Sequence, residues 1–169
     1  MIILVNAGQQ TVQPSWRLLL SHPLHFLSFG LGTGLAPKAP GTVGTLLGFP
    51  LYWILMGLPL TLQWLALAVL FLFGIWCCEF TGRALGVSDH GAIVWDEVVA
   101  MAAVLITVPL SIGWGMAAFA CFRLFDIWKP FPISWADRYV KGGLGVMLDD
   151  GLAAVMAILV LQIVQRIPA

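Results

Sequence analysis

Residues 39–78 read APGTVGTLLGFPLYWILMGLPLTLQWLALAVLFLFGIWCC and hold no aspartate, glutamate, lysine or arginine over 40 positions. Near their middle stands Gly57-Leu58-Pro59, and glycine and proline are residues that end helices and form tight reversals. The stretch therefore predicts a helical hairpin with arms at Thr45–Met56 and Leu60–Cys78. The second arm has the roughly 20 apolar residues that cross a hydrocarbon layer, whereas the first arm is short.

Two further windows, 98–122 and 151–165, also lack charged residues. The first is broken at Pro109-Leu110-Ser111-Ile112-Gly113, which predicts a second hairpin with arms at Val98–Val108 and Trp114–Phe125. The second window predicts a last apolar helix at Gly151–Val164. We therefore expect an all-α integral membrane bundle of about five to seven helices, made of two apolar hairpins and a C-terminal helix. Residues 17–169 would form one domain, and residues 1–16 a flexible tail.

The composition agrees with a membrane protein and excludes several other classes. Apolar residues make up 60% of the chain and charged residues 9%, against about 45–50% and 25% in typical soluble domains. The formal net charge is zero and the basic residues form no dense run, so a nucleic-acid partner is not expected. The three cysteines lie in apolar runs, which predicts buried side chains and not a zinc or disulfide framework.

The charged residues are gathered between the apolar segments. Thirteen of the sixteen fall in residues 79–97 and 123–150, and these two stretches hold all eight carboxylates. Two out-and-back hairpins would place both stretches on one membrane face, together with seven of the eight basic residues. The positive-inside tendency makes that face cytoplasmic. The short arms leave a second arrangement open, in which some helices enter only one leaflet.

Six carboxylates fall at the predicted helix ends on this face. Helix packing would bring several of them close together, where their mutual repulsion is costly unless they share a cation. Hard divalent ions take oxygen ligands, and Mg²⁺ is commonly held by one or two carboxylates together with substrate phosphate oxygens. The predicted Mg²⁺ ligands are Glu79, Asp96, Glu97, Asp126, Asp149 and Asp150.

Ordinary structural roles remain open for the same acids. Asp96, Asp149 or Asp150 could be a helix N-cap, where backbone N–H groups and the helix dipole stabilise an acid. Glu79 lies four residues before Arg83, and Asp126 three residues after Arg123, so each could form a local ion pair. Capping does not explain why the acids come as adjacent pairs.

Residues 30–48, GLGTGLAPKAPGTVGTLLG, cannot be one continuous helix. Their glycine amides, their threonine hydroxyls and Lys38 could cradle an anion, although a plain connecting loop explains the composition as well. In residues 122–150, Arg123 and Lys129 flank Asp126. Phosphoryl chemistry needs cationic side chains beside a metal site. The side chains hold the phosphate oxygens, and the metal ion offsets the charge of these oxygens.

Three blocks taken together resemble the phosphatidylglycerophosphatase A family: APKAPGTVGT (36–45), DHGAIVWDEVVA (89–100) and FRLFDIWKPFPISWADRYVKGGLGVMLDDGLAA (122–154). Members are magnesium-dependent lipid phosphatases of the bacterial inner membrane that hydrolyse phosphatidylglycerophosphate to phosphatidylglycerol and phosphate. The resemblance implies this reaction on a membrane phospholipid, with active-site loops in the cytoplasm. The acidic motif of the family falls on Glu79, Asp96, Glu97, Asp126, Asp149 and Asp150, and its basic and glycine-loop positions fall on Lys38, Thr42, Arg123 and Lys129. Our candidate catalytic residues are Asp96, Glu97, Asp126 and Asp150, and Gly44 and Thr45 are further candidates for substrate binding.

Two other functions stay open from the sequence. Asp149-Asp150-Gly151 followed by Ala153 is a partial match to the aspartate motif of CDP-alcohol phosphatidyltransferases, but the later paired aspartates are missing. Intramembrane acids can also mark a non-enzymatic, ion-handling or scaffold subunit. Acids gathered at one face, and not along the depth of the bundle, favour the phosphatase. Phosphatidic acid is the obvious competing substrate.

Overall fold

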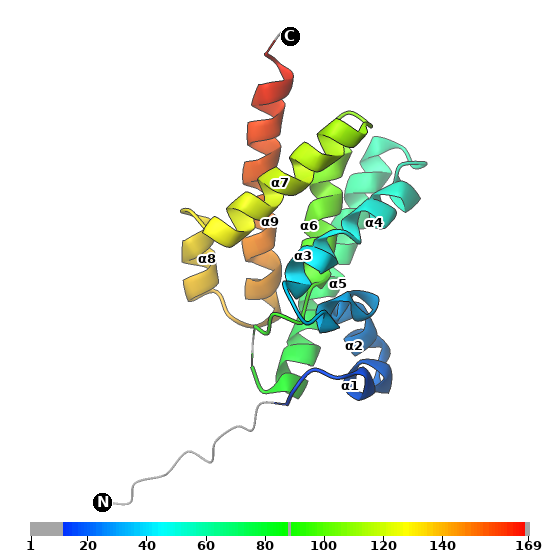
Figure 1. Cartoon of the computed structure of the whole chain (residues 1–169), viewed down its shortest axis with the longest axis vertical. Coiled ribbons are helices and arrows are strands. Elements are labelled where there is room, and N and C mark those ends of the chain that lie inside the picture. The colour runs from blue at the N-terminus through cyan, green and yellow to red at the C-terminus, as the bar shows by residue number, and fades with distance from the viewer. Residues whose placement is uncertain (1–11, 88, 168–169) are drawn as a thin grey trace, which may run out of the picture.

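The computed structural model describes residues 12–87 and 89–167, and this part of the chain is helical and contains no strand. Figure 1 shows the long helices running roughly along one axis, with the C-terminus at one end and the first helices at the other. The elements in chain order are α1 (Trp16–Ser21), α2 (Pro23–Ser28), the 3₁₀ helix η1 (Gly30–Leu35), α3 (Pro40–Thr45), α4 (Gly48–Leu55), α5 (Leu60–Leu85), α6 (Trp95–Ile106), α7 (Ile112–Trp128), α8 (Ile133–Tyr139) and α9 (Gly142–Gln165).

The all-α class is confirmed, but the described residues form more helices than the expected five to seven. Glycine and proline divide residues 23–48 into short pieces: Pro23 begins α2, Pro40 begins α3, and the backbone between Gly30 and Gly32 has positive φ angles. Residues 1–11 of the predicted tail lie outside the described part. Val12 donates a backbone hydrogen bond to Leu85 O, so residue 12 contacts the end of α5.

The centre of the bundle is formed by α5, α6 and α9. Helix α9 packs along α5 on one side and along α6 and α7 on another, while α8 covers its first turns. The buried side chains between them are largely small or aliphatic, such as Ala102, Ala153 and Ala157, which allows the helices to approach closely. This packing fixes the relative position of the acidic residues on α6, α7 and α9.

The turn of the first predicted hairpin lies at the expected residues, but its two arms do not pack along each other. The chain reverses at residues 56–59 between α4 and α5, and α4 then packs on α6 instead of along α5. Gly48 makes this contact possible, because a β-carbon there would collide with Met101. Helix α5 also continues seven residues beyond the predicted end at Cys78, so Glu79 lies inside a helix and not at its end.

The last helix begins nine residues before the predicted start at Gly151. Its first turns contain three glycines, which sequence analysis treats as helix breakers. In the structure these glycines are contact positions: a β-carbon at Gly143 would collide with Ile75 O, and one at Gly145 with Val140 O. The glycine-rich segment therefore lets α9 start close against α5, and Asp149 and Asp150 fall in the helix interior.

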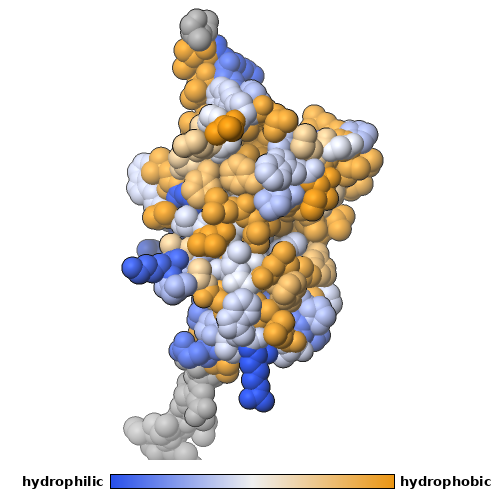
Figure 2. Space-filling view, turned by 45° about the vertical axis from the view of Figure 1, so that its right-hand side comes forward, coloured by the Kyte–Doolittle hydropathy of each residue, from blue (hydrophilic) through white to orange (hydrophobic). Residues whose placement is uncertain are grey.

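Large apolar side chains cover much of the outer surface. Figure 2 shows hydrophobic residues over most of one face, with hydrophilic residues mainly toward the end that carries α1 and α2. Helices α5 and α9 are both long and apolar enough to cross a membrane by length and composition. Leu65, Leu72 and Trp76 on α5 and Leu159 on α9 are more than half exposed. A monomer in water rarely exposes so much contiguous apolar surface, so a membrane bundle agrees with this surface.

Candidate metal and phosphate site

Three carboxyl groups meet inside the bundle. Asp96 and Glu97 lie in the first turn of α6, and Asp150 lies on the facing side of α9. One carboxylate oxygen from each residue lies within 4.8 Å of the others. Asp96 is 8% exposed and Asp150 only 3%. We call these three residues the acidic cluster.

Each member of the acidic cluster has a buried oxygen without a hydrogen-bond donor among the described residues. These atoms are Asp96 Oδ1, Glu97 Oε2 and Asp150 Oδ2. Buried polar atoms are nearly always paired, and buried charges are paired or coordinate metals. The free oxygens of three carboxylates in one small volume therefore fit a hard cation, which takes oxygen ligands of this kind.

The pKa values of the two acids on α6 also favour a bound cation. Burial, together with the charges of Glu97 and Asp150, holds the pKa of Asp96 well above its usual range. Burial likewise raises the pKa of Glu97 to about 7. Asp96 and Glu97 lie in the first turn of α6, which has 12 residues and is shorter than a membrane span. A divalent cation would offset the cost of keeping these acids ionised.

The capping interpretation of the acids is wrong in this structure. Val94 is the N-cap of α6 and Lys141 is the N-cap of α9, so neither Asp96 nor the Asp149–Asp150 pair occupies a cap position. Asp96 and Glu97 still benefit from the positive end of the α6 dipole. Neighbouring residues on a helix point about 100° apart, so Asp149 and Asp150 face different surroundings.

Arg123 lies beside the acidic cluster and connects it to two other elements. Its guanidinium forms a short ion pair with Asp126 one turn later on α7, lies 3.8 Å from Glu97 Oε1 and donates to Thr45 Oγ1 at 3.4 Å. Asp126 interacts electrostatically with both Glu97 and Asp150. Four of the six predicted metal ligands are therefore near one another, and the predicted Arg123 and Thr45 adjoin them.

Gly41 brings the α3 backbone against the same cluster. Thr45 donates its hydroxyl hydrogen to Gly41 O at 2.8 Å, and a β-carbon at Gly41 would collide with Glu97 Oε1. A larger residue at Gly41 would therefore displace the Glu97 carboxylate. Gly41 belongs to the glycine-rich segment 30–48, whose amides the sequence offers as an anion cradle.

Asp149 belongs to a second group of charges. Its Oδ2 accepts from Lys129 Nζ at 2.6 Å, and Lys129 also donates to Asp137 Oδ1 at 2.7 Å. These two carboxylates raise the pKa of Lys129 even though burial opposes the shift. Lys129 is held at the end of α7 in a left-handed backbone conformation. Sequence analysis missed Asp137, because no spacing rule links it to Lys129 across the Pro130–Pro132 turn.

Glu79 has different partners from the acidic cluster. Its Oε2 accepts from the backbone N–H of Gly143 at 2.8 Å, and its Oε1 accepts from Arg83 Nε at 2.7 Å. The side chain thereby satisfies one of the free N–H groups at the start of α9 and ties α5 to α9. The local ion pair that the spacing allowed is present.

We predict that Glu79→Gln keeps the turnover expected from the family resemblance within about threefold of wild type, because a glutamine oxygen can still accept from Gly143 and only an exposed ion pair is lost. Phosphate release by the purified variant measures this. A loss of turnover that added Mg²⁺ restores would instead make Glu79 a metal ligand.

The remaining predicted site residues lie around α3. Lys38 is exposed just before α3, Thr42 is half-buried within it, and Gly44 is buried against Val94 at the start of α6. Of the histidines, His25 is buried, and its Nδ1 lies 3.0 Å from Thr81 Oγ1. His90 accepts from the Ala92 N–H in a local turn.

Known proteins similar to this chain show its family. The family model for phosphatidylglycerophosphatase A matches residues 26–165, which include every element of the site. The chain belongs to the phosphatidylglycerophosphatase A family. It is 42% identical over 142 residues to phosphatidylglycerophosphatase A of Escherichia coli, covering 83% of each protein. It is 45% identical over 154 residues to phosphatidylglycerophosphatase A of Haemophilus influenzae, covering 90% of this chain and 94% of that relative. No solved structure matches the chain.

Proposed function

We propose that this member of the phosphatidylglycerophosphatase A family is a phosphoric monoester hydrolase that converts phosphatidylglycerophosphate to phosphatidylglycerol and phosphate with the help of Mg²⁺. The observation that supports this most strongly is the acidic cluster, whose buried oxygens lack donors and lie beside Arg123. The names of the relatives supply the substrate, and the site supplies groups suited to a phosphate monoester.

Asp96, Glu97 and Asp150 are the residues that would hold the cation, and Asp126 is close enough to join them or to orient Arg123. The set is all carboxylate, which suits Mg²⁺ better than softer metals. When bound, the ion would offset the charge of the phosphate and polarise its P–O bonds. A buried position strengthens this electrostatic stabilisation, because the local dielectric constant is low.

The cationic residues around the cluster would bind the phosphate. Arg123 already has a donor directed at Thr45 and an unpaired buried Nε, so part of its donor capacity is free for a phosphate oxygen. Lys129 is fixed between Asp137 and Asp149 on the neighbouring side. Hydrolysis adds water at phosphorus and releases the glycerol oxygen as a hydroxyl, and both steps gain from donors placed around the phosphate before the reaction.

The position of the site fits a substrate held in a bilayer. Helices α5 and α9, with 26 and 24 residues, are about 39 and 36 Å long and exceed a hydrocarbon core of about 30 Å. Seven of the eight basic residues precede α9 or lie at its N-cap, while Arg166 follows the opposite end of α9. This asymmetry supports a site at the cytoplasmic face of the bacterial inner membrane.

Family membership favours the phosphatase over the two alternatives from the sequence. Asp149 and Asp150 have separate partners in the structure, and their pairing does not form the shared site that a phosphatidyltransferase motif would need. Family membership also argues against a non-enzymatic subunit, because the two relatives are both named as phosphatases.

The test is phosphate release by the detergent-purified protein from phosphatidylglycerophosphate and, separately, from phosphatidic acid, each with Mg²⁺ and with a chelator. We expect release from phosphatidylglycerophosphate that requires Mg²⁺ and is abolished by the chelator. Equal release from both lipids would make the protein a general lipid phosphatase. Release that survives the chelator would contradict the metal-dependent mechanism, and no release from either lipid would contradict the enzyme assignment.

A further inference from the structure

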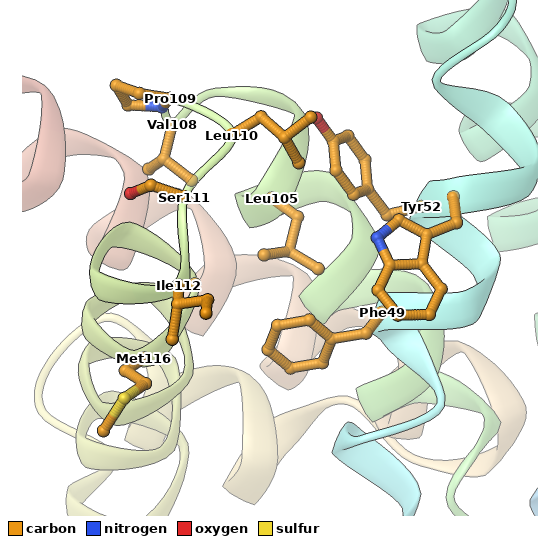
Figure 3. A pocket seen from close by; sticks show the side chains of 11 residues that line it. Phe49, Tyr52, Leu105, Val108, Pro109, Leu110, Ser111, Ile112 and Met116 are labelled. Atoms are coloured by element: carbon orange, nitrogen blue, oxygen red, sulfur yellow. The ribbon is translucent and has the colours of Figure 1, made fainter.

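An apolar pocket of about 410 Å³ lies between α4, α6 and α7, away from the charged groups. Figure 3 shows Phe49 and Tyr52 from α4 and Leu105 from α6 pointing toward its centre, with Ile112 and Met116 of α7 along its edge. None of its lining residues is charged, and its polar side chains include only Tyr52, Ser111 and the indole of Trp53. Such a lining suits hydrocarbon and not a phosphate or sugar headgroup.

The helices that line this pocket also carry the phosphate site. On α6, Leu105 follows Glu97 by eight residues, and on α7, Met116 precedes Arg123 by seven; both spacings keep residues on one helix face. Phe49 follows Thr45 by four residues across the α3–α4 junction. Half-buried Phe49 and Phe119 and buried Met101 belong to the same hydrophobic cluster as Leu105 and Val108 of the pocket. The pocket is thus lined by α4 and by α6 and α7, the two helices that also carry Glu97 and Arg123.

The distance between the acidic cluster and the apolar pocket is comparable to the depth of one bilayer leaflet. Eight residues of helix separate Leu105 from Glu97 by about 12 Å, and one leaflet of a hydrocarbon core is about 15 Å deep. The outer edge of the pocket is formed by exposed Ile112, Met116 and Trp53, which are 85%, 68% and 62% exposed. A chain that starts at a headgroup near the acidic cluster can therefore enter the pocket from the lipid side.

We infer that this pocket binds an acyl chain of the phospholipid substrate and so positions the phosphate over the acidic cluster. The inference rests on the proposed function, because it assumes that the lipid headgroup lies at the cluster. Bulk lipid is as apolar as the pocket, so the acyl chain gains no free energy from leaving water when it enters the pocket. The favourable effect comes from the packing of the chain in the pocket and from the placement of the phosphate. The expected consequence is selectivity for chains long enough to reach Leu105.

The test is Met116→Trp, which adds bulk at an exposed position on the edge of the pocket, with Leu159→Trp on the exposed face of α9 as the matched control. Both proteins are assayed with dioleoyl and with dioctanoyl phosphatidylglycerophosphate. We expect Met116→Trp to lower kcat/KM about tenfold for the dioleoyl lipid, because a misplaced substrate reacts slowly, and to change it by less than about twofold for the dioctanoyl lipid. Leu159→Trp should change neither value. Equal losses with both lipids, or the same loss in the control, would overturn the inference.

A second measurement does not depend on turnover. Wild-type protein in nanodiscs is irradiated with phosphatidylglycerophosphate that carries a diazirine on one acyl chain, and the labelled peptides are identified by mass spectrometry. We expect labels concentrated on α4, α6 and the first half of α7, and fewer in Met116→Trp. Labels spread evenly over the exposed faces of α5 and α9 would overturn the pocket, whereas pocket labelling in a protein without phosphatase activity would refute only the proposed function.

Discussion

Asp150→Asn is expected to lower kcat by at least about 1,000-fold while the protein still folds, because it removes one of the three carboxylates that we propose as ligands of the cation. Asp150 is 3% exposed and its Oδ2 has no donor among the described residues. The substitution keeps the size of the side chain, so packing around it changes little. Phosphate release at saturating Mg²⁺ measures the loss.

Thermal unfolding separates this role from a structural one. In the presence of a chelator, Asp150→Asn should be as stable as wild type or more stable, because it relieves repulsion among buried acids that no cation compensates. Added Mg²⁺ should raise the melting temperature of wild type and not of the variant. Glu79→Gln, a carboxylate-to-amide change outside the cluster, is the matched control. A variant that loses stability under both conditions and keeps its turnover would contradict metal binding by Asp150.

Arg123→Ala is expected to reduce both stability and turnover. The Arg123 side chain is 15% exposed and pairs with two carboxylates that are each 12% exposed. Removing one partner from a buried ion pair leaves uncompensated charge and costs about 3–5 kcal/mol of unfolding free energy. Turnover should fall at least about 100-fold, because the residue is also the nearest donor for the phosphate.

Arg123→Lys separates the effect on stability from the effect on turnover. Lysine retains the charge, so much of the stability should return, but it lacks the planar fork of donors and should leave turnover low. Arg83→Ala is the control, because Arg83 forms a single ion pair and its side chain is 79% exposed. That variant should change the unfolding free energy by less than about 1 kcal/mol. Full turnover in Arg123→Lys would indicate a purely structural arginine.

The sequence predicted the elements that charge and helix-breaking residues define. Charge-free windows located α5, α6 and α7, and the turns at Gly57–Pro59 and Pro109–Gly113 separate helices as expected. Segregation of the acids also predicted that six carboxylates would gather, and Asp96, Glu97, Asp126 and Asp150 do lie near one another. Asp149 and Glu79 instead bind Lys129 and the N–H of Gly143. These inferences needed only local sequence and the side-chain types.

The predictions from the sequence were wrong where tertiary packing decides the position of a helix or the partner of a side chain. The glycines of residues 142–145 indicate a break in isolation, yet they let α9 begin against α5, which moved the start of the helix and gave Glu79 a capping role. The separation of α4 from α5 depends on the close contact of Gly48 with Met101, which no hydropathy pattern reveals. The Lys129–Asp137 pair depends on how the chain returns through α8.

The most direct test of the account is the binding of a divalent cation to the acidic cluster. Mn²⁺, which accepts the same oxygen ligands as Mg²⁺, can be titrated into the purified protein and followed by electron paramagnetic resonance. The account predicts a saturable Mn²⁺ signal in wild type that Mg²⁺ displaces and that is lost in Asp150→Asn but not in Glu79→Gln. A wild-type protein that binds no Mn²⁺, or an Asp150→Asn variant that binds it unchanged, would contradict the metal site.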